Sequence, residues 1–275
     1  GILNDVDNAI VFLMRCLKKY YGKDVMLFID EYDTPFIEAK TGNFYQELKG
    51  SLATLLRSSL KNSEDLKYAF ITGIQRVAKE NIFSDLNNLD VYTVCDREYS
   101  EYFGFDSDET KKLLEYYGLE LNNEVKEMYD GYHIGNQDIY NPWSITNYLD
   151  KKKIGAYWAA TSSNTLINSL IQQSATDMKE KMEILLQEKE ILVTFDEQIV
   201  FEQLQQDKNA IWSLLLASGY LKVLEVEQRG ILLEPWYHLK ITNLETLGMF
   251  TGMFKSWFFA GNSSGGINAD SGKTV

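Results

Sequence analysis

Two short apolar segments constrain the fold of this chain more than any other feature. Val25–Ile29 reads VMLFI and Leu66–Thr72 reads LKYAFIT, and a third short strand is expected at Val91–Cys95. Apolar residues recur at helical spacing over residues 4–20 and again over Phe44–Leu60. An unbroken apolar run is typical of a strand covered on both faces, and a helix between two such strands indicates parallel pairing. The sequence therefore predicts an α/β fold built on part of a parallel sheet.

Three carboxylates follow the first of these strands directly. Asp30, Glu31 and Asp33 stand within four residues, in the stretch VMLFIDEYDTPF. Ligands of open α/β sheets bind at the carboxyl ends of the strands, where this acidic cluster is expected to lie. In that setting Asp30 would hold Mg²⁺, usually through its water shell, and Glu31 would polarise the water that attacks a γ-phosphate. The alternative is an acidic turn that is solvated or caps the next helix.

The second strand ends in polar residues that fit the same chemistry. Thr72 closes the run AFIT and is a candidate sensor of the γ-phosphate, and Arg76 follows four residues later. An arginine at that place could reach a nucleotide phosphate within its own subunit or in a neighbour. The alternatives are an ordinary residue at a strand end for Thr72 and a surface ion pair for Arg76.

The remainder of the chain has a different character. Two short helices are expected at Asp106–Tyr117 and Asn122–Tyr129, with Ser107 capping the first. A turn-rich connector, DGYHIGNQDIYNPWS, precedes a helix that begins near Pro142. Further helix is predicted over residues 163–188.

The C-terminal third is predicted to resemble a winged-helix unit. Ile191–Phe201 is expected to be a hairpin around Asp196 and Glu197. The expected order after it is helix, strand, turn, strand, helix, at Lys208–Ala217, Tyr220–Glu225, residues 228–230, Ile231–Ile241 and Asn243–Phe259. After Gly261 the chain has almost nothing to bury and is expected to be disordered.

Charge and composition exclude several classes of function. The formal net charge of −13 argues against broad, sequence-independent DNA binding. No apolar run approaches the roughly 20 residues of a membrane span. Cys16 and Cys95 form no CxxC pair and are expected to be buried thiols of a cytoplasmic protein. With His133 and His238 they match no familiar zinc spacing.

Several long motifs together resemble one family. They are VMLFIDEYDTPF, AFITGIQRVAKENIFSDLNNLDVYTV, EYFGFDSDE, YDGYHIGNQDIYNPWSI and YHLKITN. In this order they are similar to the AAA-ATPase-like proteins of bacteria and archaea, over about residues 5–258. Members often carry a C-terminal PD-(D/E)xK nuclease-like domain, and this chain resembles the middle part of such a protein.

The resemblance implies a P-loop ATPase core, a helical lid and a winged-helix-like segment. It divides the chain into residues 1–105, 106–160 and 161–260, with a disordered tail at 261–275. It further implies ATP and Mg²⁺ as cofactors, and a protein partner or nuclease-like domain that the ATPase would drive. The residues matched to family motifs are Asp30, Glu31 and Asp33 in DEYD, Thr72 and Arg76 in TGxxR, Phe103–Phe105 in FGF, and Asn141, Pro142 and Trp143 in NPW.

The phosphate-binding loop of this family is not found among the 275 residues. Such a loop places Gly-Lys-Ser/Thr at the start of a helix. The sole Gly-Lys-Thr stands at residues 272–274, where Ile267 occupies the position of the required glycine. We therefore interpret the chain as contributing the Walker B-like side of an ATP site, and we expect no appreciable ATP hydrolysis by the chain alone.

Two other functions stay open at this stage. The chain could be a non-enzymatic module whose C-terminal segment contacts a protein or, less readily, DNA, since that segment has no net basic face. A nuclease is the weaker alternative, because Asp30 or Asp33 followed by Glu38-Ala39-Lys40 matches D…ExK only superficially. Asn141 and Trp143, with Asp130 and Tyr132, either line the nucleotide or lid interface or form a hydrogen-bonded turn that docks the lid.

Overall fold

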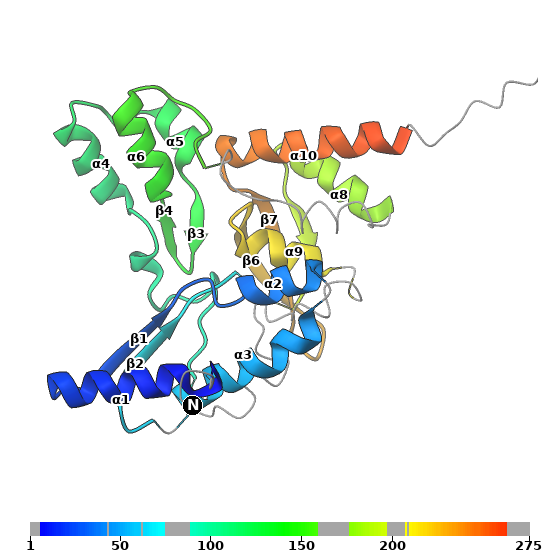
Figure 1. Ribbon diagram of the computed structural model, residues 1–275. Coiled ribbons are helices and arrows are strands. Elements are labelled where there is room, and N and C mark those ends of the chain that lie inside the picture. The colour runs from blue at the N-terminus through cyan, green and yellow to red at the C-terminus, as the bar shows by residue number, and fades with distance from the viewer. Residues whose placement is uncertain are drawn as a thin grey trace, which may run out of the picture. The chain divides into compact units, whose positions relative to one another are not determined.

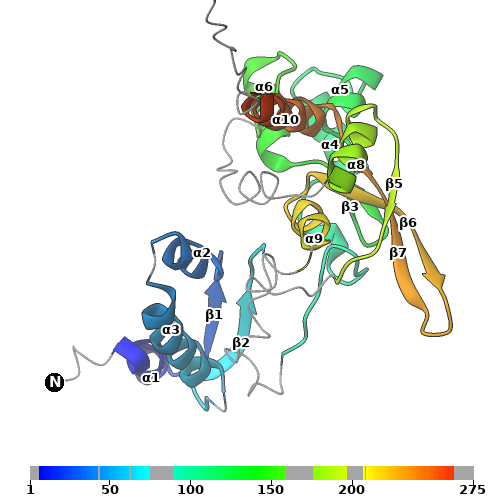
Figure 2. The ribbon, with the colours of Figure 1, turned by 90° about the vertical axis from the view of Figure 1, so that its right-hand side faces the viewer.

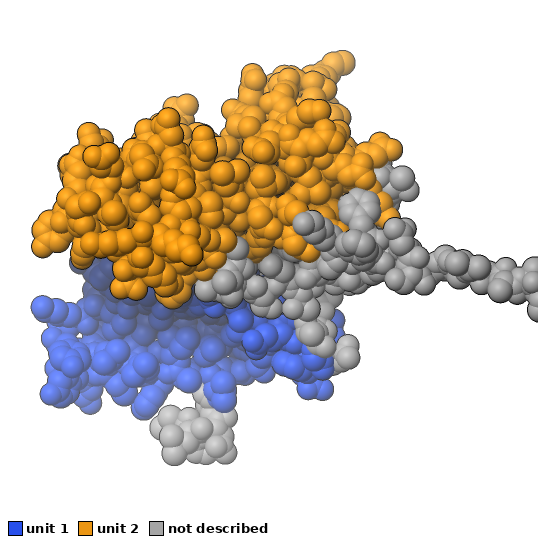
Figure 3. Space-filling model, turned by 90° about the horizontal axis from the view of Figure 1, so that it is seen from above, with its two compact units in different colours: residues 1–91, 196–214 blue, residues 92–195, 215–275 orange. Residues whose placement is uncertain are grey.

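The computed structural model describes residues 6–262, apart from residues 43, 62, 75–88, 159–175, 197–206 and 208. The chain forms two compact units, coloured separately in Figure 3. Unit 1 comprises residues 1–91 and 196–214, and unit 2 comprises residues 92–195 and 215–275. The four-part division of the chain into residues 1–105, 106–160, 161–260 and 261–275 stays a prediction. The expected disordered tail falls outside the described residues, apart from its first two.

Unit 1 contains the predicted helices and parallel strands. A short 3₁₀ turn, η2 (Val6–Asn8), leads into α1 (Ala9–Tyr21), and β1 (Val25–Ile29) follows. Two helices, α2 (Thr34–Thr41) and α3 (Tyr45–Leu60), connect β1 to β2 (Leu66–Ile71). The two strands pair in parallel, with Phe28 opposite Phe70 and Ile29 opposite Ile71. The mixed α/β class is therefore confirmed, and both strands lie where the apolar runs placed them.

One face of the parallel pair does not match the prediction that both faces are covered. Leu27, Ile29, Ala69 and Ile71 pack against a core cluster that α2 and α3 supply, namely Phe36, Ala53, Leu56 and Leu60. The opposite face is exposed, and Phe28, which stacks on Phe70 with ring centroids 5.6 Å apart, is 67% exposed. In Figure 2 the three helices α1, α2 and α3 lie on one side of the two strands. Apolar content alone could not distinguish a face that a helix covers from one that is left open.

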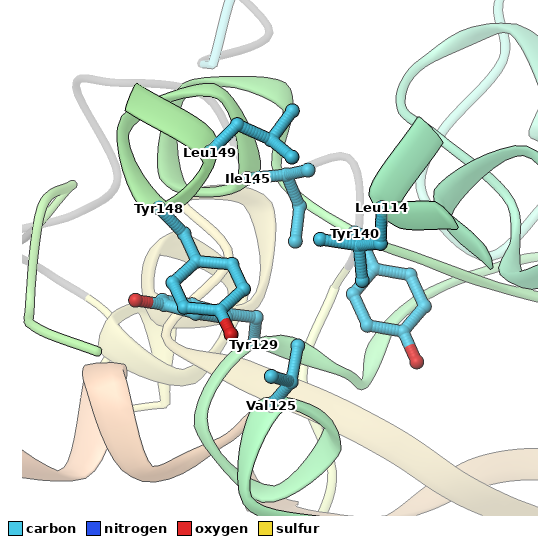
Figure 4. Close-up of a cluster of buried hydrophobic side chains, with 7 residues drawn as sticks. All are labelled: Leu114, Val125, Tyr129, Tyr140, Ile145, Tyr148 and Leu149. Atoms are coloured by element: carbon cyan, nitrogen blue, oxygen red, sulfur yellow. The ribbon is translucent and has the colours of Figure 1, made fainter. Parts of the chain in front are cut away.

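The first part of unit 2 is a small helical assembly with one hairpin. It contains η4 (Ser100–Tyr102), α4 (Ser107–Tyr116), α5 (Asn123–Tyr129), the hairpin strands β3 (Tyr132–Ile134) and β4 (Gln137–Ile139), and α6 (Pro142–Lys151). Figure 4 shows its core, in which the rings of Tyr129 and Tyr148 lie 5.9 Å apart. The Tyr129 hydroxyl donates to the carbonyl of Gly155 at 2.9 Å, and burial raises the pKa of Tyr129 to about 12. This core holds α4, α5 and α6 together.

Local side-chain hydrogen bonds set the ends of these helices. Asp106, and not Ser107 as predicted, caps α4, because its carboxylate accepts from the Glu109 amide while the Glu109 carboxylate accepts from the Asp106 amide. Asn122 caps α5 in a simpler way, by accepting from the Val125 amide. Carboxylate and amide side chains satisfy the free amides of a first helical turn, and here the residue before the expected cap does so.

The strand predicted at Val91–Cys95 is wrong. Residues 91–93 belong to no strand, and residues 94–95 form a turn. The Asp96 carboxylate accepts from both the amide and the hydroxyl of Thr93, and the Cys95 amide donates to the Thr93 hydroxyl. These local bonds give the backbone an alternative to strand pairing.

The second part of unit 2 is a three-stranded antiparallel sheet with flanking helices. Its described elements are α8 (Thr176–Leu186), β5 (Ile191–Val193), β6 (Leu221–Arg229), β7 (Glu234–Ile241) and α10 (Leu244–Asn262), and α9 (Ala210–Ala217) precedes β6. The strand order is β5-β7-β6. Figure 1 labels two of these strands, β6 and β7. Helix, strand, strand and helix therefore occur in the predicted sequence order. β5 pairs with β7, a partner that was not predicted, and the second half of the hairpin predicted over Ile191–Phe201 lies outside the described residues.

Candidate functional site

Asp30 and Thr72 meet at the carboxyl end of the parallel pair. Because Ile29 lies opposite Ile71, the next residue of each strand arrives at the same edge. The Thr72 hydroxyl donates a hydrogen bond to Asp30 Oδ1. The same oxygen accepts from the Glu31 amide at 2.9 Å. Parallel register thus joins two residues that are 42 positions apart in the chain.

Glu31 adopts a backbone conformation that is rare for a residue with a side chain. Its φ is +50°, in the left-handed region, and the next amide, of Tyr32, donates to the Thr72 carbonyl at 3.0 Å. Such a conformation costs of order 1 kcal/mol for a non-glycine residue, and residues of this kind concentrate at functional sites. The turn directs the chain from β1 into α2 and leaves Glu31 exposed beside Asp30.

Asp33 is buried and accepts a hydrogen bond from the backbone. The residue is only 2% exposed, and its Oδ2 accepts from the Ile74 amide at 3.1 Å. Gly73 permits this approach, since a Cβ at that position would lie 2.5 Å from Asp33 Oδ1. The third acid of DEYD therefore fixes the segment after β2 against the start of α2. A direct part for Asp33 in nucleotide binding stays a prediction.

The other predicted site residues are placed as follows. Arg76 lies outside the described residues. Asn141 and Trp143 belong to unit 2, where Asn141 Oδ1 accepts from the Trp143 amide at 2.9 Å and so caps α6. The Trp143 indole is 53% exposed and donates to the Tyr157 carbonyl at 3.3 Å. These contacts match the hydrogen-bonded turn considered from the sequence, and a nucleotide contact of either residue stays a prediction.

The carboxylate oxygens at the edge of the parallel pair are suitable ligands for a hydrated divalent cation. Both described hydrogen bonds of Asp30 go to Oδ1, so within the described part of the chain Oδ2 has no donor. Mg²⁺ retains most of its water and needs only one or two carboxylates when phosphates supply the rest. Among the described residues no group of three or more His, Cys, Asp or Glu side chains could hold a metal ion without such help. Asp30 could therefore hold a metal that arrives with a nucleotide.

One buried acid was missed by the sequence reasoning. Glu245, in the first turn of α10, is fully buried, and its two carboxylate oxygens accept from the Ser144 hydroxyl and the Trp158 amide, each at 2.7 Å. A glutamate at the start of a helix is common for electrostatic reasons and usually lies in solvent. No sequence pattern therefore distinguishes Glu245 from the glutamates of this chain that lie in solvent.

The fold and this edge define an α/β protein with acidic residues at the carboxyl end of a parallel strand pair. Residues 3–83 match the sequence profile of the AAA-ATPase-like family, described as predicted AAA-ATPase. The family recognition is therefore confirmed over this segment, which contains Asp30, Glu31, Asp33 and Thr72.

One curated relative is described as an uncharacterized protein in the vnfD 5' region of Azotobacter chroococcum mcd 1. It is 26% identical over 228 residues, which are 82% of this chain and 41% of the relative. The chain thus spans about two fifths of that relative's length. No solved structure matches the chain. Within the described residues no helix is long and apolar enough to cross a membrane.

Proposed function

We propose that this chain contributes the metal and water-activating side of an ATP site in an AAA-ATPase-like protein. The observation that carries the proposal is the joined edge of β1 and β2, where Thr72 orients the Asp30 carboxylate and Oδ2 has no hydrogen-bond donor among the described residues. The family match over residues 3–83 supports the same assignment.

Each residue of the edge would have a separate task. Asp30 Oδ2 would face the water shell of Mg²⁺, which neutralises phosphate charge when it is bound. Glu31 would accept a proton from, or orient, the attacking water. Thr72 fixes the Asp30 rotamer and presents a hydroxyl near the position expected for the γ-phosphate. Arg76 would add a positive charge beside that phosphate.

A paramagnetic probe tests the site without requiring turnover. We would add Mn²⁺·ATP to the ¹⁵N-labelled chain and record line broadening of backbone amides. The expected result is selective broadening at Glu31 and Thr72 that Asp30→Asn abolishes. Asp24→Asn is the matched control, because Asp24 is an exposed acid at the other end of β1, where it pairs with Lys18 at 3.0 Å. Broadening that persists in Asp30→Asn, or that centres equally on Asp24, would overturn the proposal.

Steady-state hydrolysis tests the accompanying expectation about turnover. No phosphate-loop motif occurs in the 275 residues, so phosphate release from Mg²⁺·ATP should stay at the level of a protein-free blank. Turnover that is lost in Glu31→Gln would contradict this expectation and show that these residues hold a complete catalytic site.

The structure bears differently on the two alternative functions, a nuclease and an interaction module. Glu38 and Lys40 lie on α2, whereas the PD-(D/E)xK arrangement requires them on a strand that pairs with the one carrying the aspartate. The nuclease alternative therefore loses its structural basis. An interaction role for the winged-helix-like C-terminal segment is compatible with the ATPase proposal, because its β6–β7 hairpin belongs to unit 2 and the edge of β1 and β2 belongs to unit 1.

A further inference from the structure

The tip of the β6–β7 hairpin exposes three consecutive apolar side chains. Ile231 is 100% exposed, Leu232 is 92% exposed and Leu233 is 61% exposed. In Figure 2 this tip projects beyond the other elements of unit 2. Single exposed apolar residues are ordinary on protein surfaces, but a contiguous group marks an interaction site or a liability to aggregate.

The tip places these residues at a conformational cost. The four-residue turn runs from Gly230 to Leu233 and is closed by the Leu233 amide, which donates to the Gly230 carbonyl at 3.3 Å. Leu233 has a φ of +52°, which a leucine adopts at a cost of about 1 kcal/mol. Asparagine or glycine would suit this position better. The turn is therefore less stable with leucine at this position than it would be with glycine or asparagine.

The strands behind the tip brace it. Arg229 forms a two-pronged ion pair with Glu227, with Nε and Nη2 at 2.8 and 2.6 Å from Oε2. The Arg229 guanidinium also lies over the Trp236 ring, 4.9 Å from its centroid. Glu227 Oε1 is 2.7 Å from His238 Nε2. A braced loop loses little conformational entropy when it binds, so this tip is pre-organised for contact.

The charge around the tip selects the kind of partner. Residues 224–236 carry three glutamates, Glu225, Glu227 and Glu234, against one arginine, a formal charge of −2 on a chain of −13. This charge disfavours a nucleic-acid backbone and an anionic lipid surface. A second copy of the same acidic tip is disfavoured for the same reason. A partner with basic residues around an apolar recess would complement both features.

We propose that Ile231, Leu232 and Leu233 form a docking element that enters an apolar recess, rimmed by lysine or arginine, on a partner protein. Glu225 and Glu234 pair with that rim and fix the orientation of the hairpin. The interaction is therefore apolar at its centre and salt-sensitive at its edge.

Two synthetic peptides of matched hydrophobicity serve as probes. Both form amphipathic helices with the same leucine face, and the polar face is lysine in one and glutamate in the other. Fluorescence anisotropy at 50 and 150 mM NaCl measures their binding to the full chain. The lysine peptide is expected to bind at least ten-fold more tightly than the glutamate peptide, and less tightly at the higher salt.

Variants assign the binding to the tip. The affinity for the lysine peptide should fall at least ten-fold in the triple variant Ile231→Ser, Leu232→Ser, Leu233→Ser. Glu225→Gln with Glu234→Gln should weaken it several-fold and reduce its salt dependence. Val6→Ser with Leu13→Ser is the control, because it removes two exposed apolar side chains from unit 1 and should leave affinity unchanged. Melting temperatures of all variants verify folding.

Several outcomes would overturn the proposal. Equal affinity for the two peptides would remove the charge argument, and undiminished affinity in the triple serine variant would remove the tip. Binding to phosphatidylcholine–phosphatidylglycerol vesicles that the triple variant loses would assign the tip to a membrane. Dimerisation in sedimentation velocity that the triple variant loses would assign it to a second copy of the chain.

Discussion

Glu245 is the residue for which the structure makes the strongest energetic prediction. Its carboxylate accepts from the Ser144 hydroxyl and the Trp158 amide inside unit 2. Glu245→Ala should lower the free energy of unfolding by about 3 kcal/mol, because the buried Ser144 hydroxyl and the part-buried Trp158 amide both lose this acceptor. Glu245→Gln retains one oxygen and should lose less. Glu234→Ala, an exposed control, should change stability by no more than about 0.5 kcal/mol in urea titrations. Equal losses for Glu245→Ala and Glu234→Ala would contradict the buried role.

His238 and Glu227 form a pair with a defined pH dependence. The hydrogen bond from His238, followed by that from Arg229, lowers the pKa of Glu227 below 4.5. The hydrogen bond to Glu227 is the main cause that raises the pKa of His238 above 6.5. Glu190, the residue before β5, adds to this rise, with its Oε1 3.4 Å from His238 Nδ1. Glu225 lies opposite His238 in the sheet.

The sign of the effect follows from these directions. The contribution of His238 is complete below its unfolded pKa of 6.5 and is lost as the pH rises through the folded value. The contribution of Glu227 is complete above 4.5 and is lost as the pH falls through its folded value. The melting-temperature difference between wild type and His238→Gln should therefore be greatest between pH 4.5 and 6.5 and shrink on both sides.

The other histidine supplies the control for this prediction. In His133→Gln, His238 is the sole histidine of the chain, so one imidazole resonance reports its titration by NMR. A midpoint at or below 6.5 would contradict the raised pKa. A melting-temperature difference that does not vary with pH would contradict the linkage.

At the scale of elements, the junction between β2 and α2 depends on the absence of a side chain at Gly73. A Cβ there would lie 2.5 Å from Asp33 Oδ1 and 2.7 Å from the Tyr32 ring, so Gly73→Ala should destabilise unit 1 by about 1–3 kcal/mol. Gly50→Ala is the matched control, since Gly50 lies inside α3 with nothing within 4 Å of an added Cβ. That change should stabilise by about 0.5–1 kcal/mol. Changes of the same sign in chemical denaturation would contradict the crowding at Gly73.

Some of the helices and strands follow from sequence patterns, and others do not. The apolar runs located β1 and β2, and the parallel register brings Asp30 and Thr72 together at one edge. Local periodicity also found α1 and α3. It could not detect the Thr93–Asp96 hydrogen bonds that replace a strand, or the pairing of β5 with β7 across more than 40 residues. Long-range partners and buried acids such as Glu245 depend on tertiary packing, and no short pattern in the sequence records that packing.

At the scale of the whole molecule, charge makes the remaining prediction. Forty acidic residues outnumber 27 basic ones, which gives the formal net charge of −13. Non-specific DNA affinity comes from lysine and arginine that displace counterions from phosphates, so a chain of this charge should bind duplex DNA only weakly. The three-stranded sheet of unit 2 does not reverse this expectation, because Lys222 and Lys240 lie opposite each other on a sheet that also carries Glu225, Glu227 and Glu234.

Fluorescence anisotropy with a labelled duplex of about 20 base pairs measures this DNA affinity. That length covers two turns of the DNA helix and exceeds the footprint of one binding module. We expect no saturation at micromolar chain in 150 mM NaCl and only a weak rise at 50 mM. A steep salt dependence together with saturable binding would reveal a basic surface that net charge conceals, and Lys222→Gln with Lys240→Gln would then locate it. If those substitutions left such binding unchanged, the basic surface would have to lie outside the three-stranded sheet. The absence of saturation would leave the apolar tip of the β6–β7 hairpin as the stronger candidate for partner contact in unit 2, because burial of apolar surface does not depend on the sign of the chain's charge.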